Sequence, residues 1–69
     1  MTRRQNEIYL FVLEFYREHG YSPTIGEICK GCYTTSYTYI RETLWRLEEM
    51  GLLKIEDGKH RAISIKEYR

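Results

Sequence analysis

Apolar and polar side chains follow one another along this chain with two different spacings. Up to Met50 the apolar positions recur every three or four residues, the spacing of a helix with one side against a core. Two short β-like segments come after that point. The pattern predicts helices over about residues 3–19, 24–31 and 36–50, and a β-hairpin over about residues 53–65.

The first helix should begin after Thr2, a candidate N-cap, and end before Gly20. At about 100° per residue, its core side holds Ile8, Phe11, Val12, Phe15 and His19, with Tyr9 and Tyr16 beside them. Leu10 and Leu13 fall on the opposite, charged side. They are either tolerated surface residues or part of a patch that contacts a second subunit or a partner.

Residues 21–51 show the pattern of a helix, a turn and a longer helix. Thr24 and Glu27 have the spacing of a capping box, and Pro23 is expected in the first turn of the second helix. A break over residues 30–34 precedes the third helix. This is the helix-turn-helix plan, which places its second helix in the major groove of DNA.

The third helix has a core side and a polar side. The core side is predicted to hold Tyr37, Ile40, Leu44 and Leu47. The polar side carries Thr35, Thr38, Tyr39, Glu42, Arg46 and Glu49, with Arg41 and Trp45 at its edges. Hydroxyls near a helix N-terminus suit phosphate and base contacts, and Glu and Arg side chains can pair with cytosine and guanine. A polar outward side is equally typical of any surface helix.

The hairpin completes the predicted architecture. Its β-like segments, residues 53–56 and 62–65, are joined by a turn over residues 57–59. The chain is therefore predicted to be mainly α with a small β-hairpin, as a single three-helix winged helix-turn-helix domain over residues 1–69.

Composition and charge leave this interpretation intact. The 69 residues, 42% of them hydrophobic, are enough for one domain with a small core. The longest apolar run, residues 8–13, is too short to cross a membrane, and no signal peptide is apparent, so a cytoplasmic location is expected.

The net charge of +1 is low for a DNA-binding protein. However, Lys and Arg outnumber acids within residues 30–46 and 59–66, which favours a basic side; evenly solvated charge is the alternative.

Several motifs along the chain resemble a known family. They are Arg-Gln-x-Glu-Ile at residues 4–8, Gly-Tyr-Ser-Pro-Thr-x-x-Glu-Ile at 20–28, Ser36, Leu-x-x-Leu-Glu-x-x-Gly-Leu-Leu at 44–53 and Gly-x-x-Arg-Ala-Ile at 58–63. The first two are the most specific. Without gaps over nearly the whole chain, the sequence resembles the N-terminal DNA-binding domain of the LexA repressors of the bacterial DNA-damage (SOS) response.

The resemblance implies a winged helix-turn-helix that reads operator DNA with the third helix in the major groove and the wing near the backbone or minor groove. By position, the implied base-reading residues are Ser36, Thr38, Tyr39, Arg41 and Glu42. Thr38, Tyr39 and Arg41 are not typical of the family, so a different operator sequence is expected. The candidate phosphate contacts are Arg4, Thr35, Arg46, Lys59, His60 and Arg61.

The chain departs from the family in three places. Tyr33 stands in the turn about where the family commonly has glycine; with Tyr9 and Tyr16 it is expected to cover the core. Apolar residues replace polar ones at three positions, which form a candidate dimer or partner patch: Leu10, Leu13 and Trp45. The 69 residues lack the family's serine–lysine self-cleaving domain, which leaves two alternatives: a naturally short protein or an excised domain.

Cys29 and Cys32 form a Cys-x-x-Cys pair on the second helix. The spacing is that of half a zinc site, whose other ligands would be His19, His60 or a second chain. A thioredoxin-like redox role requires a βαβ context that this pattern lacks. We expect both thiols to pack in the core as small apolar groups, without a metal.

The sequence gives no indication of an enzyme. It has no Gly-rich phosphate loop or paired-His metal motif, so no catalytic residue, cofactor or small-molecule substrate is expected. The function predicted is a sequence-specific double-stranded DNA-binding regulator, a LexA-like repressor that acts on its operator as a homodimer. The alternative is a winged-helix protein-interaction module that serves as an accessory factor for another regulator. Steep weakening of binding with salt would distinguish the first from the second.

Overall fold

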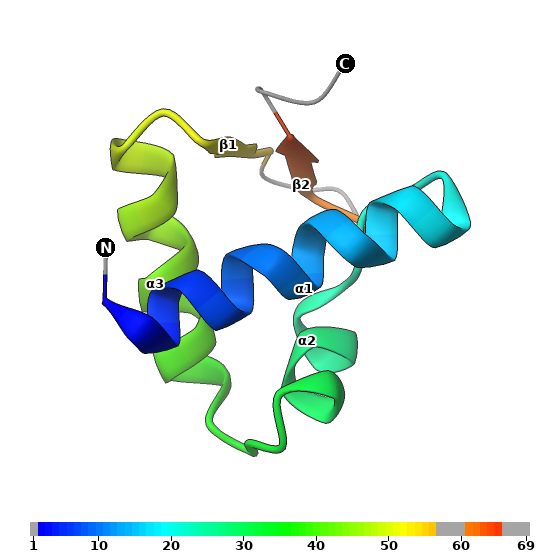
Figure 1. Ribbon diagram of the computed structural model, residues 1–69. Coiled ribbons are helices and arrows are strands. Elements are labelled where there is room, and N and C mark those ends of the chain that lie inside the picture. The colour runs from blue at the N-terminus through cyan, green and yellow to red at the C-terminus, as the bar shows by residue number, and fades with distance from the viewer. Residues whose placement is uncertain (1, 57–60, 66–69) are drawn as a thin grey trace.

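The computed structural model describes residues 2–56 and 61–65, and it contains three helices followed by two short strands. The elements are α1 (Arg3–His19), α2 (Ile25–Gly31), α3 (Tyr37–Glu49), β1 (Leu53–Ile55) and β2 (Ile63–Ile65). In Figure 1, α1 runs across the molecule, α3 crosses it near its N-terminal end, α2 lies below it and the two strands lie above it. The mainly helical winged helix-turn-helix is thus confirmed.

Local side chains determine where the helices begin. The Thr2 hydroxyl accepts a hydrogen bond from the Gln5 amide, and the Gln5 side chain accepts one from the Thr2 amide in return. Thr24 and Glu27 form the same reciprocal capping box at the start of α2, as predicted. Because Thr24 is the N-cap, Pro23 precedes the helix and is buried there; its predicted place in the first turn was wrong.

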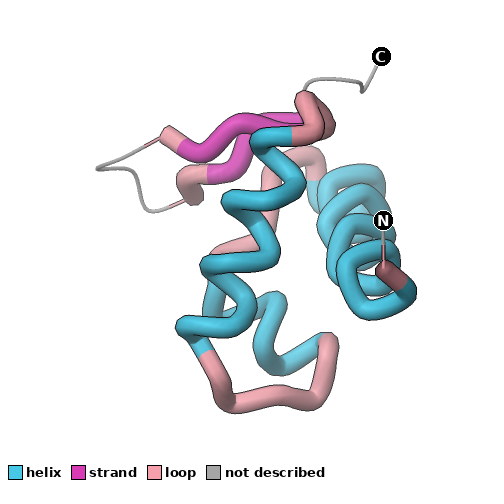
Figure 2. Tube along the Cα trace, turned by 90° about the vertical axis from the view of Figure 1, so that its left-hand side faces the viewer, coloured by secondary structure: helices cyan, strands magenta, loops and turns pink. Residues whose placement is uncertain are grey.

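The core is formed where the three helices and the hairpin meet. It consists of Ile8, Val12, Ile28, Cys29, Ile40, Leu44, Leu47, Leu53 and Ile63. The last two come from β1 and β2, which pair antiparallel with Lys54 opposite Ser64. Figure 2 shows the strands beside the C-terminal end of α3, so the wing closes one end of the core.

Three residues predicted in or over the core lie outside it. Tyr37 is 54% exposed, because it is the first residue of α3 and lies at the edge of the core next to α2. Its hydroxyl lies beside Gly26. Tyr33 is 95% exposed in the turn. His19, the last residue of α1, is exposed and stacks on Phe15, with ring centroids 4.1 Å apart.

A residue that the periodicity did not assign to the core completes the inner side of α3. Thr43 is buried, and its hydroxyl donates a 2.9 Å hydrogen bond to the Tyr39 carbonyl within the same helix. The backbone oxygen thus satisfies the hydroxyl, so that a threonine is tolerated among apolar neighbours.

The two cysteines pack as predicted. Cys29 belongs to the buried core, Cys32 is half-buried against it, and both thiols are free. Burial, partly offset by the nearby Arg4 charge, raises the pKa of Cys32 above its usual value. Within residues 2–56 and 61–65, no group of three His, Cys, Asp or Glu side chains is placed to hold a metal ion.

Candidate nucleic-acid interface

The outer side of α3 is the surface on which most of the implied base-reading residues lie. Thr38 and Glu42 are exposed in its first two turns on the side turned away from Leu44 and Leu47, and Arg41 is exposed at the edge of that side. In Figure 2, α3 runs along one side of the molecule while α1 lies on the other, so this surface is left open. The implied base-reading side chains are therefore brought together on one accessible surface.

Ser36 holds the start of that helix. Its hydroxyl oxygen accepts a 3.2 Å hydrogen bond from the Tyr39 amide, and its own amide donates to the Thr34 hydroxyl at 3.2 Å. The N-cap role thus uses one lone pair of the Ser36 hydroxyl oxygen. Thr35, the next candidate contact, is exposed beside it and lines a shallow groove between α2 and α3 together with Lys30.

Arg4 connects α1 to both ends of the turn. One guanidinium nitrogen approaches the Cys32 carbonyl at 3.4 Å, the other approaches Glu7 at 3.4 Å, and the group lies 5.9 Å from the Tyr39 ring centroid. Arg4 is half-exposed in this position. A positive charge is thus held next to the first turn of α3.

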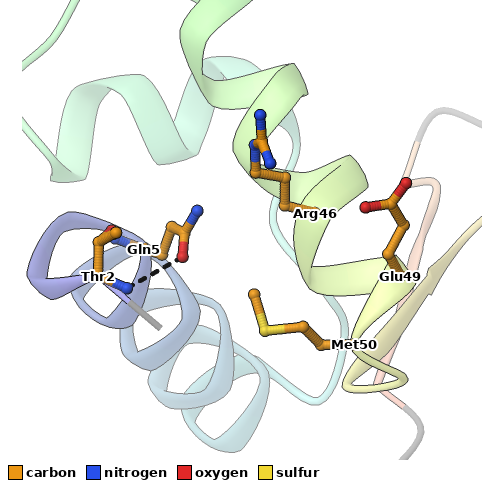
Figure 3. A pocket seen from close by; sticks show the side chains of 5 residues that line it. All are labelled: Thr2, Gln5, Arg46, Glu49 and Met50. Atoms are coloured by element: carbon orange, nitrogen blue, oxygen red, sulfur yellow. Dashed lines mark hydrogen bonds between the residues drawn. The ribbon is translucent and has the colours of Figure 1, made fainter.

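Arg46 lies farther along α3, in a second shallow groove. Figure 3 shows this groove between the start of α1, with Thr2 and Gln5, and the last turn of α3, with Glu49 and Met50. Arg46 is exposed, and its guanidinium points away from the Glu49 carboxylate in this view. Arg4 and Arg46 therefore place positive charge near opposite ends of α3.

Arg61 has partners within the protein. Its guanidinium donates to both carboxylate oxygens of Glu27, at 2.8 and 3.2 Å, and to the Ser22 carbonyl at 2.8 Å. The same group lies over the Tyr21 ring, 4.3 Å from its centroid. The hydrogen bonds from Arg61, followed by that from the Thr24 amide, lower the pKa of Glu27 from 4.5 to about 2. The other two wing candidates, Lys59 and His60, fall outside the described residues.

The candidate partner patch is divided between two helices. Leu10 is 46% exposed on the side of α1 opposite Ile8 and Val12, whereas Leu13 is half-buried. Trp45 is 51% exposed and lies on the outer side of α3, one turn beyond Glu42. Helical geometry thus assigns Trp45 to the same surface as the implied base-reading residues.

The sequence pattern did not reveal the second role of Glu27. The capping box was visible in the spacing of Thr24 and Glu27, but its carboxylate also binds a guanidinium 34 residues further along the chain. The only signal in the sequence was chemical: an acid in one motif and an arginine in another, without any indication that they meet.

These features together define a winged helix-turn-helix domain: two capped helices joined by a tight turn, an exposed polar surface on the second, and an antiparallel hairpin after it. Residues 1–62 match the family model of the LexA DNA binding domain. The chain belongs to this family.

Curated relatives agree with that assignment. The chain is 42% identical over 62 residues to the LexA repressor of Clostridium botulinum, covering 90% of this chain and 31% of that protein. It is 38% identical over 65 residues to the LexA repressor of Koribacter versatilis, covering 94% of this chain and 31% of the relative. The chain thus spans about a third of the length of these relatives, and it matches their DNA-binding part. Among the described residues, no helix combines the length and apolar character needed to cross a membrane.

Proposed function

We propose that this chain is a sequence-specific double-stranded DNA-binding domain that represses transcription by occupying an operator. The observation that carries the proposal is the family match over residues 1–62, on a fold that leaves the first turns of α3 open. The relatives are LexA repressors, and a link to the bacterial DNA-damage response is proposed on the same basis. We further propose that it acts in the cytoplasm and binds as a homodimer to two related half-sites.

In the proposed complex, α3 lies in the major groove. Thr38, Arg41 and Glu42 would meet base edges, with Ser36 and Tyr39 at the start of the helix. Arg4, Thr35 and Arg46 would meet the phosphates that flank the groove. Lys59 and His60 remain candidate phosphate contacts of the wing. Since several of these side chains differ from the family's typical residues, the operator should differ as well.

The test is selection from a random pool of duplexes, followed by titration of the enriched duplex at several salt concentrations. We expect an enriched motif with two related halves and an affinity that falls steeply with salt. Glu42→Ala and Thr38→Ala should each change the preference for the base that the side chain reads, by roughly 1–3 kcal/mol. Arg46→Ala should weaken binding to all duplexes and reduce the salt slope by about one.

Arg17→Ala is the matched control for Arg46→Ala, because Arg17 is an exposed arginine on the outer side of α1. It removes the same charge and should leave the salt slope almost unchanged. Failure to enrich any motif, with binding only at low salt, would contradict the proposal. Half-exposed Leu10 and Trp45 favour a protein-interaction module as the second candidate. Binding of a protein partner that is insensitive to salt and is abolished in Trp45→Ala would support it.

A further inference from the structure

We propose that Arg61 is a positioning residue, which fixes the wing against the start of α2 through Glu27 and Ser22 instead of binding a DNA phosphate. The inference rests on the proposed function, because the position of the wing matters for binding only if the domain binds DNA. We call the contact between Arg61, Glu27 and Ser22 the wing clamp.

The geometry of the wing clamp restrains the guanidinium in several directions. Two parallel hydrogen bonds to Glu27 fix its plane, because a carboxylate and a guanidinium match as two flat forks. The third bond goes to the carbonyl of Ser22, a residue only 5% exposed. One side of the group is covered by Tyr21. Arg61 is consequently left with 31% of its side chain exposed.

The acceptor is also fixed. The Glu27 oxygen that receives the 2.8 Å bond from Arg61 receives a 2.9 Å bond from the Thr24 amide as well. Glu27 is therefore held at the N-cap of α2 by a contact that does not involve the wing. Since α2 packs against α3, the wing clamp places the second strand of the wing relative to the helix-turn-helix.

The other strand of the wing has an attachment of its own. β1 follows directly after α3, and the Ile55 amide donates a 3.2 Å hydrogen bond to the Glu48 carboxylate at the end of that helix. The wing is thus held at β1 by α3 and just before β2 by α2. Without Arg61, the wing would lose this polar attachment next to β2, and within residues 2–56 and 61–65 its orientation would depend on the attachment at β1, the strand pairing and the burial of Leu53 and Ile63.

Charge argues against a phosphate role for the same side chain. Each phosphate that a cation neutralises contributes to the salt dependence of binding. Arg61 is already neutralised by Glu27, which stays ionised at neutral pH because its pKa is about 2. A phosphate that approached Arg61 would also meet the negative charge of Glu27, whose side chain is 38% exposed next to it. The pair should therefore add little to the attraction between the protein and DNA.

Two substitutions give opposite results under the two interpretations. If the wing clamp positions the wing, Glu27→Gln should weaken affinity for the selected duplex about threefold to tenfold, which is in the lower part of the range for coupled neighbours. If Arg61 binds a phosphate, Glu27→Gln removes a competing negative charge and should strengthen affinity. Arg61→Lys separates the interpretations again: lysine keeps the charge but loses the bidentate geometry, so it should weaken binding only if the clamp is needed.

The salt slope and a double variant complete the test. Arg61→Gln should weaken binding with an unchanged salt slope, and Arg61→Gln with Glu27→Gln should bind no worse than either single variant. A slope reduced by about one in Arg61→Gln, or tighter binding by Glu27→Gln, would overturn the proposal. The proposal would also be overturned if the variants were less stable than the wild type but bound DNA with wild-type affinity at temperatures where they are folded.

A measurement without DNA separates failure of the inference from failure of the proposed function. The Glu56 amide donates a 2.7 Å hydrogen bond to the Ala62 carbonyl, next to Arg61. Hydrogen exchange at this amide should be several times faster in Glu27→Gln than in the wild type. Unchanged exchange would overturn the wing clamp even if the protein binds DNA. If exchange were faster in Glu27→Gln but the wild-type protein bound no duplex, the wing clamp would be supported and the proposed function would be wrong.

Discussion

The close approach of α1 and α2 at Gly31 makes the effect of one methyl group predictable. A Cβ added at Gly31, the last residue of α2, would lie 2.0 and 2.4 Å from two carbons of the Phe11 ring on α1. Non-bonded carbon atoms do not repel each other at separations of about 3.5 Å or more, so the Phe11 ring would have to move by roughly 1.5 Å. Phe11 packs against the core, and this retreat would disturb the contact between α1 and α2.

Gly26 provides a matched control in the same helix. An added Cβ there would have the Tyr37 hydroxyl oxygen as its nearest neighbour, at 2.9 Å. That atom is the end of an exposed side chain and can move at little cost. Replacement of glycine by alanine within a helix gains up to about 1 kcal/mol. Gly26→Ala should therefore stabilise the domain or leave it unchanged.

Gly31→Ala should gain less helix stability than Gly26→Ala, because Gly31 is the last residue of α2. The substitution also carries the cost of overpacking against Phe11. That cost is typically about 1–3 kcal/mol, so a net loss of about 1–2 kcal/mol is expected. A loss of this size would lower Tm by roughly 4–8 °C for each kcal/mol in a domain of this length.

Urea unfolding followed by far-UV circular dichroism would measure both variants against the wild type. The midpoint should fall in Gly31→Ala and should rise or stay unchanged in Gly26→Ala, while the m-value stays constant in both. If Gly31→Ala were as stabilising as Gly26→Ala, Phe11 would not be held against α2. The reasoning from this close approach would then be refuted.

Three further predictions concern single residues. Tyr33 has a backbone φ of 57°, which is strained for an aromatic residue, so Tyr33→Gly should stabilise the domain by about 1 kcal/mol in urea unfolding; Tyr33→Ala keeps the strain and should give no comparable gain. Because the pKa of Glu27 is lowered from 4.5 to about 2, the stability from its ionised form is complete above about pH 4.5 and is lost as the pH falls through about 2. Urea midpoints measured across this window should fall less in Glu27→Gln, and parallel curves would contradict the assignment. The raised pKa of half-buried Cys32 should make its alkylation at neutral pH slower than that of a free thiol, and buried Cys29 should react more slowly still, as mass spectrometry can determine.

Much of the fold was predictable because local chemistry specifies it. The two capping boxes and Gly20, with its φ of 80°, mark helix ends through interactions among residues three or four apart. The core positions Ile8, Val12, Leu44 and Leu47 followed from helical periodicity. Tyr37 was misplaced because periodicity gives a direction around the helix axis, but not whether another element covers that end of the helix.

The candidate site was predictable only as far as one helix carries it. The exposure of Thr38, Arg41 and Glu42 follows from the core side of α3. The partners of Arg61 did not follow from the sequence, because the contact with Glu27 joins residues 34 positions apart. A positive residue in a wing motif is equally compatible with a phosphate or a carboxylate, and only the tertiary arrangement distinguishes them. Which bases the exposed side chains contact stays a prediction.

The wing's share of the core has a consequence for how the chain folds as it is synthesised. Leu53 is fully buried and Ile63 is 6% exposed, so the core stays incomplete until residue 63 has left the ribosome. The helices can form earlier from local hydrogen bonds, but the contacts that join wing to helices close long segments of chain and carry a larger entropic cost. The domain is therefore expected to fold in one late, cooperative step, and a nascent chain of which only the first 52 residues have left the ribosome should expose Ile8, Val12 and Leu47 to solvent and to chaperones.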